Sequence, residues 1–180
     1  MNQVVKLGLF YAALSILISL TISLINPELL FSGTSSLVLM AVSILMLILG
    51  GRYFLRSSDQ DLPYGTAVKY LFIASLIGTV CILIYTTIAY GNNENMETMY
   101  RDYSIRSAEK GIELSINLVG GSEADLQQAK DEYHEKLENG EVSIPSYPYS
   151  LSALPLTFLM SAFIGLIYSL IAAIFVKKKG

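Results

Sequence analysis

The sequence predicts an all-α protein, a bundle of four transmembrane helices with an extramembrane helical hairpin between the third and fourth helices. Three observations predict this fold. The 180 residues are 53% hydrophobic and 15% charged, with a mean hydropathy of +0.52. Four apolar runs reach the length of about 20 residues that a helix needs to cross a hydrocarbon core of about 30 Å. Charged residues gather between Gly91 and Tyr149, so the expected segments are 1–90, 91–149 and 150–180.

The first apolar run extends from Val4 to Ile25 and ends at Asn26-Pro27, because proline disfavours a helical residue before it. The run exceeds the apolar part of a typical secretory signal, and no small-residue cleavage site precedes Asn26, so we expect a retained helix. Three serines recur every four residues along one face, which predicts close packing against another helix. A polar lining for a solute path is the alternative for Ser15, Ser19 and Ser23.

The second and third runs continue this pattern. The run from Ser36 to Leu55 is apolar on every side, which is typical of a helix that faces lipid or lies within a bundle. The run from Ala67 to Tyr90 contains Ala74 and Gly78, two small residues four positions apart that favour a close helix contact. Cys81, the single cysteine, lies in this run, so the chain cannot form an internal disulfide or a thiolate metal cluster.

The polar interval is expected to form two amphipathic helices. Apolar residues recur at three- or four-residue spacing from Met96 to Leu118, and again in the stretch from Glu123 to Leu137. The glycine pair at 120–121 separates them, and Ser122 followed by Asp125 resembles a capping box. The sequence therefore predicts a hairpin, whose small core does not suffice in water. Its apolar faces must contact the bundle, the membrane surface, a second copy or a protein partner.

The same interval is strongly acidic. It contains 12 acidic and 5 basic residues, hence a net charge of −7, and the whole chain carries −3. Nucleic acid is therefore not an expected partner, because it would repel such a surface. The lipid bilayer, a membrane protein partner or a homo-oligomer are the expected contacts. The candidate docking residues lie on the apolar faces and are Tyr100, Tyr103, Ile112, Ile116, Leu126, Tyr133 and Leu137.

The last apolar run extends from Leu151 to Val176, with Pro155 in its first turns, where a missing amide hydrogen costs little. Its small residues follow one another at four-residue steps, which again predicts a close helix contact. They are Ser161, Gly165, Ser169 and Ala173.

The basic residues predict the orientation, because short cytoplasmic loops carry an excess of Lys and Arg. The connection between the first two spans has none, whereas both chain ends and the second connection are basic. We therefore expect both termini in the cytoplasm and residues 91–149 outside it, although the five basic residues of the interval leave the inverted orientation open. The residues on which this expectation rests are Lys6, Arg52, Arg56, Lys69, Lys177, Lys178 and Lys179.

Residues that could support catalysis are few. His134, the only histidine, forms H-E-x-x-E with Glu138, whereas the zinc-protease pattern needs a second histidine at that place. We interpret these two residues as part of a solvated helix face, and the alternative is a weak cation contact. Asp59 and Asp61 are likewise interpreted as part of an ordinary charged loop, and the alternative there is a small polar site. The span interiors contain no ionisable residue, which disfavours ion-coupled transport. We therefore expect no enzyme activity, no cofactor and no metal.

Two stretches carry a resemblance to a bacterial family. Residues 61–69 read DLPYGTAVK and lead into an apolar run with SLIG at 75–78, and residues 165–179 read GLIYSLIAAIFVKKK. Over nearly its whole length the chain resembles the proteins grouped as domain of unknown function 4199. The resemblance implies a four-helix protein of the bacterial cytoplasmic, or inner, membrane. It implies no activity, cofactor or catalytic residue.

The sequence favours a non-enzymatic function in which the hairpin docks a protein partner or a second copy. The alternative is a facilitative permease or pore for a small neutral solute, lined by serines and tyrosines. A membrane enzyme that uses His134 or the loop carboxylates is a third interpretation.

Overall fold

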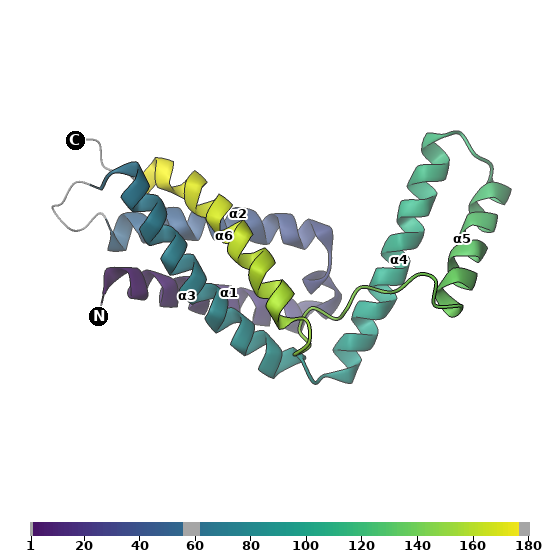
Figure 1. The fold of residues 1–180 in the computed structure, drawn as a ribbon, viewed down its shortest axis with the longest axis horizontal. Coiled ribbons are helices and arrows are strands. Elements are labelled where there is room, and N and C mark those ends of the chain that lie inside the picture. The colour runs from purple at the N-terminus through teal and green to yellow at the C-terminus, as the bar shows by residue number, and fades with distance from the viewer. Residues whose placement is uncertain (1, 56–61, 177–180) are drawn as a thin grey trace. The chain divides into compact units, whose positions relative to one another are not determined.

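The computed structural model describes residues 2–55 and 62–176, and every regular element in these ranges is helical. This confirms the predicted all-α class. The chain divides into two compact units, one built from the first three and the last of the long helices and one formed by residues 93–147. The elements are α1 (Gln3–Ile25), the 3-10 helix η1 (Pro27–Leu30), α2 (Gly33–Phe54), α3 (Tyr64–Tyr90), α4 (Glu94–Leu118), α5 (Glu123–Glu138) and α6 (Leu154–Val176) (Figure 1).

Within the described ranges, four helices are long and apolar enough to cross a membrane. These are α1, α2, α3 and α6, which are 22 to 27 residues long and coincide with the four apolar runs. The boundaries differ by a few residues from those expected. Helix α2 begins before Ser36, because the Ser32 hydroxyl accepts the Ser35 N–H at 3.1 Å and caps the helix. Helix α6 begins after Leu151, with Pro155 as its second residue.

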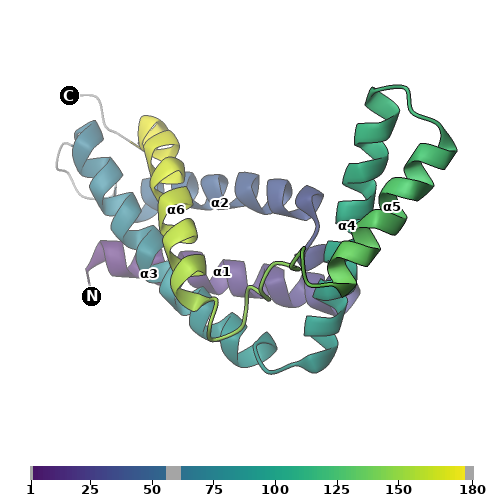
Figure 2. The ribbon, with the colours of Figure 1, turned by 45° about the vertical axis from the view of Figure 1, so that its right-hand side comes forward.

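The four long helices form a ring in the order α1, α3, α6, α2. Helix α3 packs against α1 on one side and α6 on the other, and α2 contacts both α6 and α1 (Figures 1 and 2). The side chains that are most fully buried include Leu7, Leu47, Leu71 and Val176, one from each helix. They pack in a single apolar cluster. The core of this unit is therefore shared by all four helices.

This core lies toward one end of the bundle. Every buried residue of α1 lies between Val4 and Ala12, every buried residue of α2 between Met46 and Gly51, and every buried residue of α6 between Gly165 and Val176. We call the end formed by these segments and the first half of α3 the closed end. At the opposite, open end, Leu24, Ile88 and other large apolar side chains are exposed.

Glycines permit the close packing at the closed end. A Cβ atom added at Gly8 would lie 2.8 Å from the Ala74 carbonyl oxygen, and one added at Gly165 would lie 2.9 Å from Ser75 Oγ. A Cβ at Gly51 would lie 2.9 Å from a methyl group of Val176. The helices approach one another so closely that no room remains for a side chain at these positions.

The second unit contains α4 and α5, which contact each other. The Asn93 side chain accepts the Met96 N–H at 3.2 Å and caps α4. After α4, Gly120 has a φ of 73°, a conformation that glycine adopts without steric penalty. The Ser122 hydroxyl accepts the Asp125 N–H, and the Asp125 carboxylate accepts the Ser122 N–H at 2.8 Å. The capping box indicated by the sequence is therefore present, with aspartate in place of glutamate.

Some residues used in the sequence interpretation lie outside the described residues. They are Arg56, Asp59, Asp61, Lys177, Lys178 and Lys179.

Candidate functional site

A polar contact connects α4 to α5. His134 Nε2 lies 2.8 Å from Glu109 Oε1, so the histidine faces the neighbouring helix rather than pairing with Glu138 one turn further along its own helix. Also on α5, Lys136 Nζ donates to Glu132 Oε1 at 2.6 Å, which lowers the pKa of that carboxyl and raises the pKa of the lysine. Residues 2–55 and 62–176 contain no group of three His, Cys, Asp or Glu side chains that could hold a metal ion.

The seven candidate docking residues are all half-buried. The Tyr133 ring lies 5.6 Å from the ring of His134, and the Tyr100 ring lies 5.7 Å from that of Tyr147, measured between centroids. A Cβ added at Gly121 would lie 2.6 Å from Ile116 Cγ2, so this isoleucine is covered by the turn. The apolar faces that the sequence identified are therefore covered in part within the unit itself.

The large apolar side chains that this unit exposes are different ones. Leu114 is 64% exposed, Leu118 85% and Val119 80%, and they lie beside the turn between α4 and α5. We call these three residues the apolar tip. Leu114 and Leu118 follow Ile112 and Ile116 by two residues, which is about 200° around a helix. The sequence interpretation followed one apolar face and missed this second pair, although its four-residue spacing is visible.

The surroundings of the apolar tip are acidic. Residues 111–129 contain Glu113, Glu123 and Asp125 and no lysine or arginine, so this stretch carries a charge of −3. Hydrogen bonds from the Ser122 backbone and hydroxyl lower the pKa of the Asp125 carboxyl. Glu123 and Asp125 also lie in the first turn of α5, where the helix dipole favours negative charge. The apolar tip is thus an exposed apolar patch beside three carboxylates.

In the bundle, the small residues singled out for helix packing occupy two kinds of position. Ala74 and Gly78 of α3, and Gly165, Ser169 and Ala173 of α6, are buried. The other four are half-buried, namely Ser15, Ser19, Ser23 and Ser161. The five buried residues belong to the closed end, so their faces are already occupied by other helices of the same chain.

Three buried residues of the bundle have hydroxyls that donate to carbonyl groups of their own helices. Ser75 Oγ donates to the Phe72 oxygen at 2.8 Å, and Ser169 Oγ donates to the Gly165 oxygen at 2.7 Å. Thr86 Oγ1 likewise donates to Leu83. Hydroxyls that are satisfied in this way need no water or solute as a partner.

An aromatic cluster lies at the open end. The ring of Tyr149, which precedes α6, has its centroid 5.5 Å from that of Tyr90 and 6.2 Å from that of Phe31. Burial, with a smaller contribution from Tyr90, raises the pKa of Tyr149 to about 12. A Cβ added at Gly91 would lie 2.7 Å from the Tyr149 carbonyl oxygen, so the chain passes very close to itself here. The cluster attaches the segment that leads into α6.

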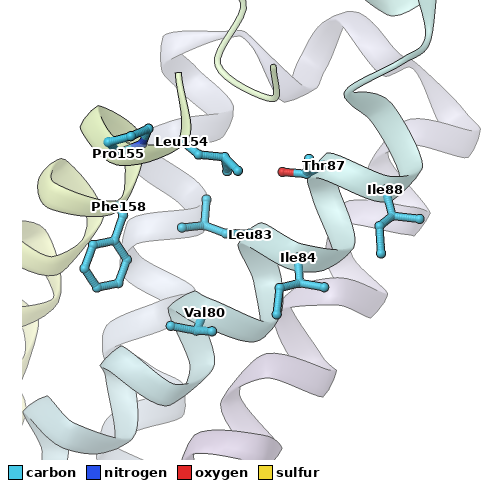
Figure 3. A pocket seen from close by; sticks show the side chains of 8 residues that line it. All are labelled: Val80, Leu83, Ile84, Thr87, Ile88, Leu154, Pro155 and Phe158. Carbon is cyan, nitrogen blue, oxygen red and sulfur yellow. The ribbon is translucent and has the colours of Figure 1, made fainter. Parts of the chain in front are cut away.

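A groove with a volume of about 520 Å³ lies between α3 and α6 at the open end (Figure 3). Seven of its eight lining residues are apolar, and the eighth is Thr87. Its hydroxyl oxygen points toward Leu154 and has no hydrogen-bond partner among the described residues (Figure 3). The lining residues are Val80, Leu83, Ile84, Thr87, Ile88, Leu154, Pro155 and Phe158. The groove was not identified from the sequence, because it depends on the contact between two helices far apart in the chain.

A model of the family described as proteins of unknown function DUF4199 matches residues 6–178. The chain belongs to this family. The match confirms the resemblance that the stretches at 61–69 and 165–179 indicated. No curated protein and no solved structure matches the chain.

The DUF4199 match runs through both units of the fold and through all six α-helices, apart from the first three residues of α1. The residues of the apolar tip and of the groove therefore lie within the matched range. Membership of DUF4199 brings no activity with it.

Proposed function

We propose that this chain is a non-enzymatic integral protein of the bacterial cytoplasmic membrane, in which α1, α2, α3 and α6 span the bilayer. Both termini are cytoplasmic, and α4 and α5 form an acidic hairpin on the other side. The hairpin docks a protein partner or a second copy through the apolar tip. The basic residues near the chain ends and the second connection support the orientation.

The observation that carries the docking proposal is the exposure of Leu114, Leu118 and Val119. Burial of apolar surface stabilises a complex by about 25 cal/mol per Å² before the costs of association are subtracted. Adjacent large apolar side chains on an otherwise charged unit are typical of a binding surface. The seven candidate docking residues on α4 and α5 are already half-buried within the unit. The apolar tip therefore has the most apolar surface that a partner could still bury.

The charges around the apolar tip favour one kind of partner. Like charges that face each other across an interface cost free energy, whereas complementary charges speed association and select the partner. Two copies that met tip to tip would bring together two stretches of charge −3. A protein with an apolar centre and basic residues around it is therefore the better match, and a second copy is the weaker one.

A crosslinking experiment tests the docking proposal. Cys81→Ser removes the single cysteine, and Asn117→Cys then carries a photoactivatable crosslinker beside the apolar tip. We expect an adduct of defined mass in intact cells, which Leu118→Asp weakens. Thr98→Cys is the matched control, because Thr98 is also exposed on α4 but lies about four helical turns before the apolar tip. This variant should not form the adduct. The same adduct from both sites, or one that Leu118→Asp leaves unchanged, would contradict the proposal.

A deletion provides a broader test. Removal of residues 96–139 eliminates both helices of the hairpin and should change the crosslinking pattern of the membrane. An unchanged pattern and phenotype would count against docking. An adduct with the mass of two chains would identify the partner as a second copy.

The proposed orientation is tested by labelling. Cysteines introduced separately at Glu123 and Asp59 into the Cys81→Ser chain should react with an impermeant reagent from opposite sides of the membrane. Reaction from the same side would rule out the four-span arrangement.

The alternative function, a facilitative permease, gains no support from the hydroxyls of the three buried serine and threonine residues. Ser75, Thr86 and Ser169 all donate to their own helices, so they do not form an open row of partners for a solute. Flux of a neutral solute into vesicles that contain the purified protein, above that of empty vesicles, would revive this alternative.

A further inference from the structure

The groove between α3 and α6 has the depth of one leaflet. On α3 its lining extends from Val80 to Ile88, a rise of about 12 Å, and the helix ends two residues later at Tyr90. Half of a hydrocarbon core of about 30 Å is about 15 Å. If α3 spans the bilayer as proposed above, the groove runs from near the headgroup level toward the middle of the membrane.

The groove is apolar along this whole depth. Seven of its eight lining residues are apolar, and the hydroxyl oxygen of the eighth, Thr87, is buried and therefore not accessible to an occupant. An acyl chain has no polar group and matches such a lining, whereas a polar occupant would lose its hydrogen bonds there. The ester carbonyls of a glycerolipid lie above the acyl chains, at the level of the Ile88 end of the groove.

A transmembrane helix of a second copy is the competing occupant, and the groove does not suit it. Close association of helices in lipid needs small residues on both faces. The small residues of α3 and α6 that could allow such a close contact, including Gly78 and Gly165, are already buried in the bundle. The exposed residues of α6 near the groove, Leu156 and Leu159, are large. A volume of about 520 Å³ is in the range of sites for small molecules, roughly 300–1,000 Å³.

We propose that this groove binds one acyl chain of a membrane glycerolipid, with the ester region of the lipid at the Ile88 end of the groove. The proposal rests on the insertion of the four long helices into a membrane, but it is independent of docking by the hairpin. The bound lipid differs from lipids elsewhere around the protein because it exchanges more slowly.

The experiment uses the fact that the chain contains no tryptophan. Phe158→Trp introduces one fluorophore into the groove wall, and Leu159→Trp introduces one at the same depth on a side chain that is 65% exposed and does not line the groove. Each full-length variant is reconstituted into vesicles of phosphatidylcholine with brominated acyl chains, which quench tryptophan on contact. The proteins are then extracted into an excess of detergent. We expect Phe158→Trp to stay quenched and Leu159→Trp to lose its quenching.

Further variants separate a bound lipid from other causes. Val80→Phe fills the groove, so adding it to Phe158→Trp should abolish the retained quenching. Leu154→Trp reports from another part of the lining and repeats the test if Phe158→Trp fails to insert. If the tryptophan fluorescence of the groove variant and of the control variant recovers equally in detergent, the proposal is overturned. Quenching that survives Val80→Phe would also overturn it.

The outcomes also distinguish this proposal from the proposed function. A helix seated in the groove would shield Phe158→Trp, so weaker quenching of this variant than of Leu159→Trp in the vesicles would overturn lipid binding in favour of a second copy. Absence of quenching in both variants before extraction would show that the chain does not insert. Deletion of residues 96–139 should leave the retained quenching unchanged even if docking is lost.

Discussion

The closed end of the bundle and the α4–α5 pair are stabilised by different means. At the closed end, stability depends on volume, because Gly8 and Gly165 lie against neighbouring helices with no space for a methyl group. In the α4–α5 pair, stability depends on hydrogen bonds at helix ends and on charges, and Gly111 has open space around it. The same type of substitution should therefore have opposite effects in the two regions.

The largest expected effect is that of Gly8→Ala. The new methyl group would meet the Ala74 carbonyl oxygen, which cannot move without its helix, so we expect a loss of about 1–3 kcal/mol of stability. The measurement is the unfolding temperature of the purified protein in detergent. Gly111→Ala is the matched control and should stabilise α4 by about 0.5–1 kcal/mol, because no atom lies within 4 Å of the added Cβ. Effects of the same sign would refute the comparison.

A smaller effect is expected from Ser122→Ala. This change removes the hydroxyl that caps α5, which typically costs about 1 kcal/mol. We expect faster hydrogen exchange in α5 and unchanged exchange in α1 and α3. Ser122→Thr retains a capping hydroxyl and should restore most of the protection. Faster exchange across the bundle in Ser122→Ala would mean that the two regions are not stabilised separately.

His134→Ala should have a still smaller effect. It removes the contact with Glu109, and exposed pairs of this kind contribute about 0.2–1 kcal/mol. Hydrogen exchange should increase slightly where α4 and α5 face each other. The substitution should leave crosslinking at the apolar tip unchanged. Loss of a biological activity without loss of structure would instead favour the enzyme hypothesis for this histidine.

The pH dependence should also be confined to the α4–α5 pair. The carboxyl of Asp125 has a pKa below its ordinary value of 3.8 because of hydrogen bonds from Ser122, so its contribution to stability is present above that value. It is lost as the pH falls through the lowered pKa of the folded state. Protection of α5 amides should therefore decrease on acidification below pH 3.8, while Asp125→Asn should remove most of this dependence. Equal acid sensitivity in α1 would contradict the prediction.

The sequence was sufficient for the parts of the fold that depend on local features. The four apolar runs identified the four long helices, and Ser122 with Asp125 identified the cap of α5, because these signals lie within one helix or one turn. The difference between the closed and open ends could not be derived in this way. It depends on which glycine of one helix meets which side chain of another, as Gly8 meets Ala74.

The candidate sites show the same division. The acidic character of residues 91–149 was evident from composition, whereas the exposure of Leu118 and Val119 depends on how α4 turns relative to α5. The groove required α3 and α6, whose lining segments are separated by more than 60 residues in the chain. Spacing in a sequence reports the faces of a helix, but it does not report which face a neighbour covers.

The composition of the closed end has a consequence for biosynthesis. Around Gly51, the side chains of Leu71 and Val176 meet, so α2, α3 and α6 all contribute to one contact. Of the elements in the core, α6 is made last, after both helices of the polar unit. The α1–α3 interface can form as soon as α3 leaves the ribosome, but the contact around Gly51 remains incomplete until α6 has been inserted. A nascent chain arrested before α6 would therefore leave an unfilled apolar site beside Gly51.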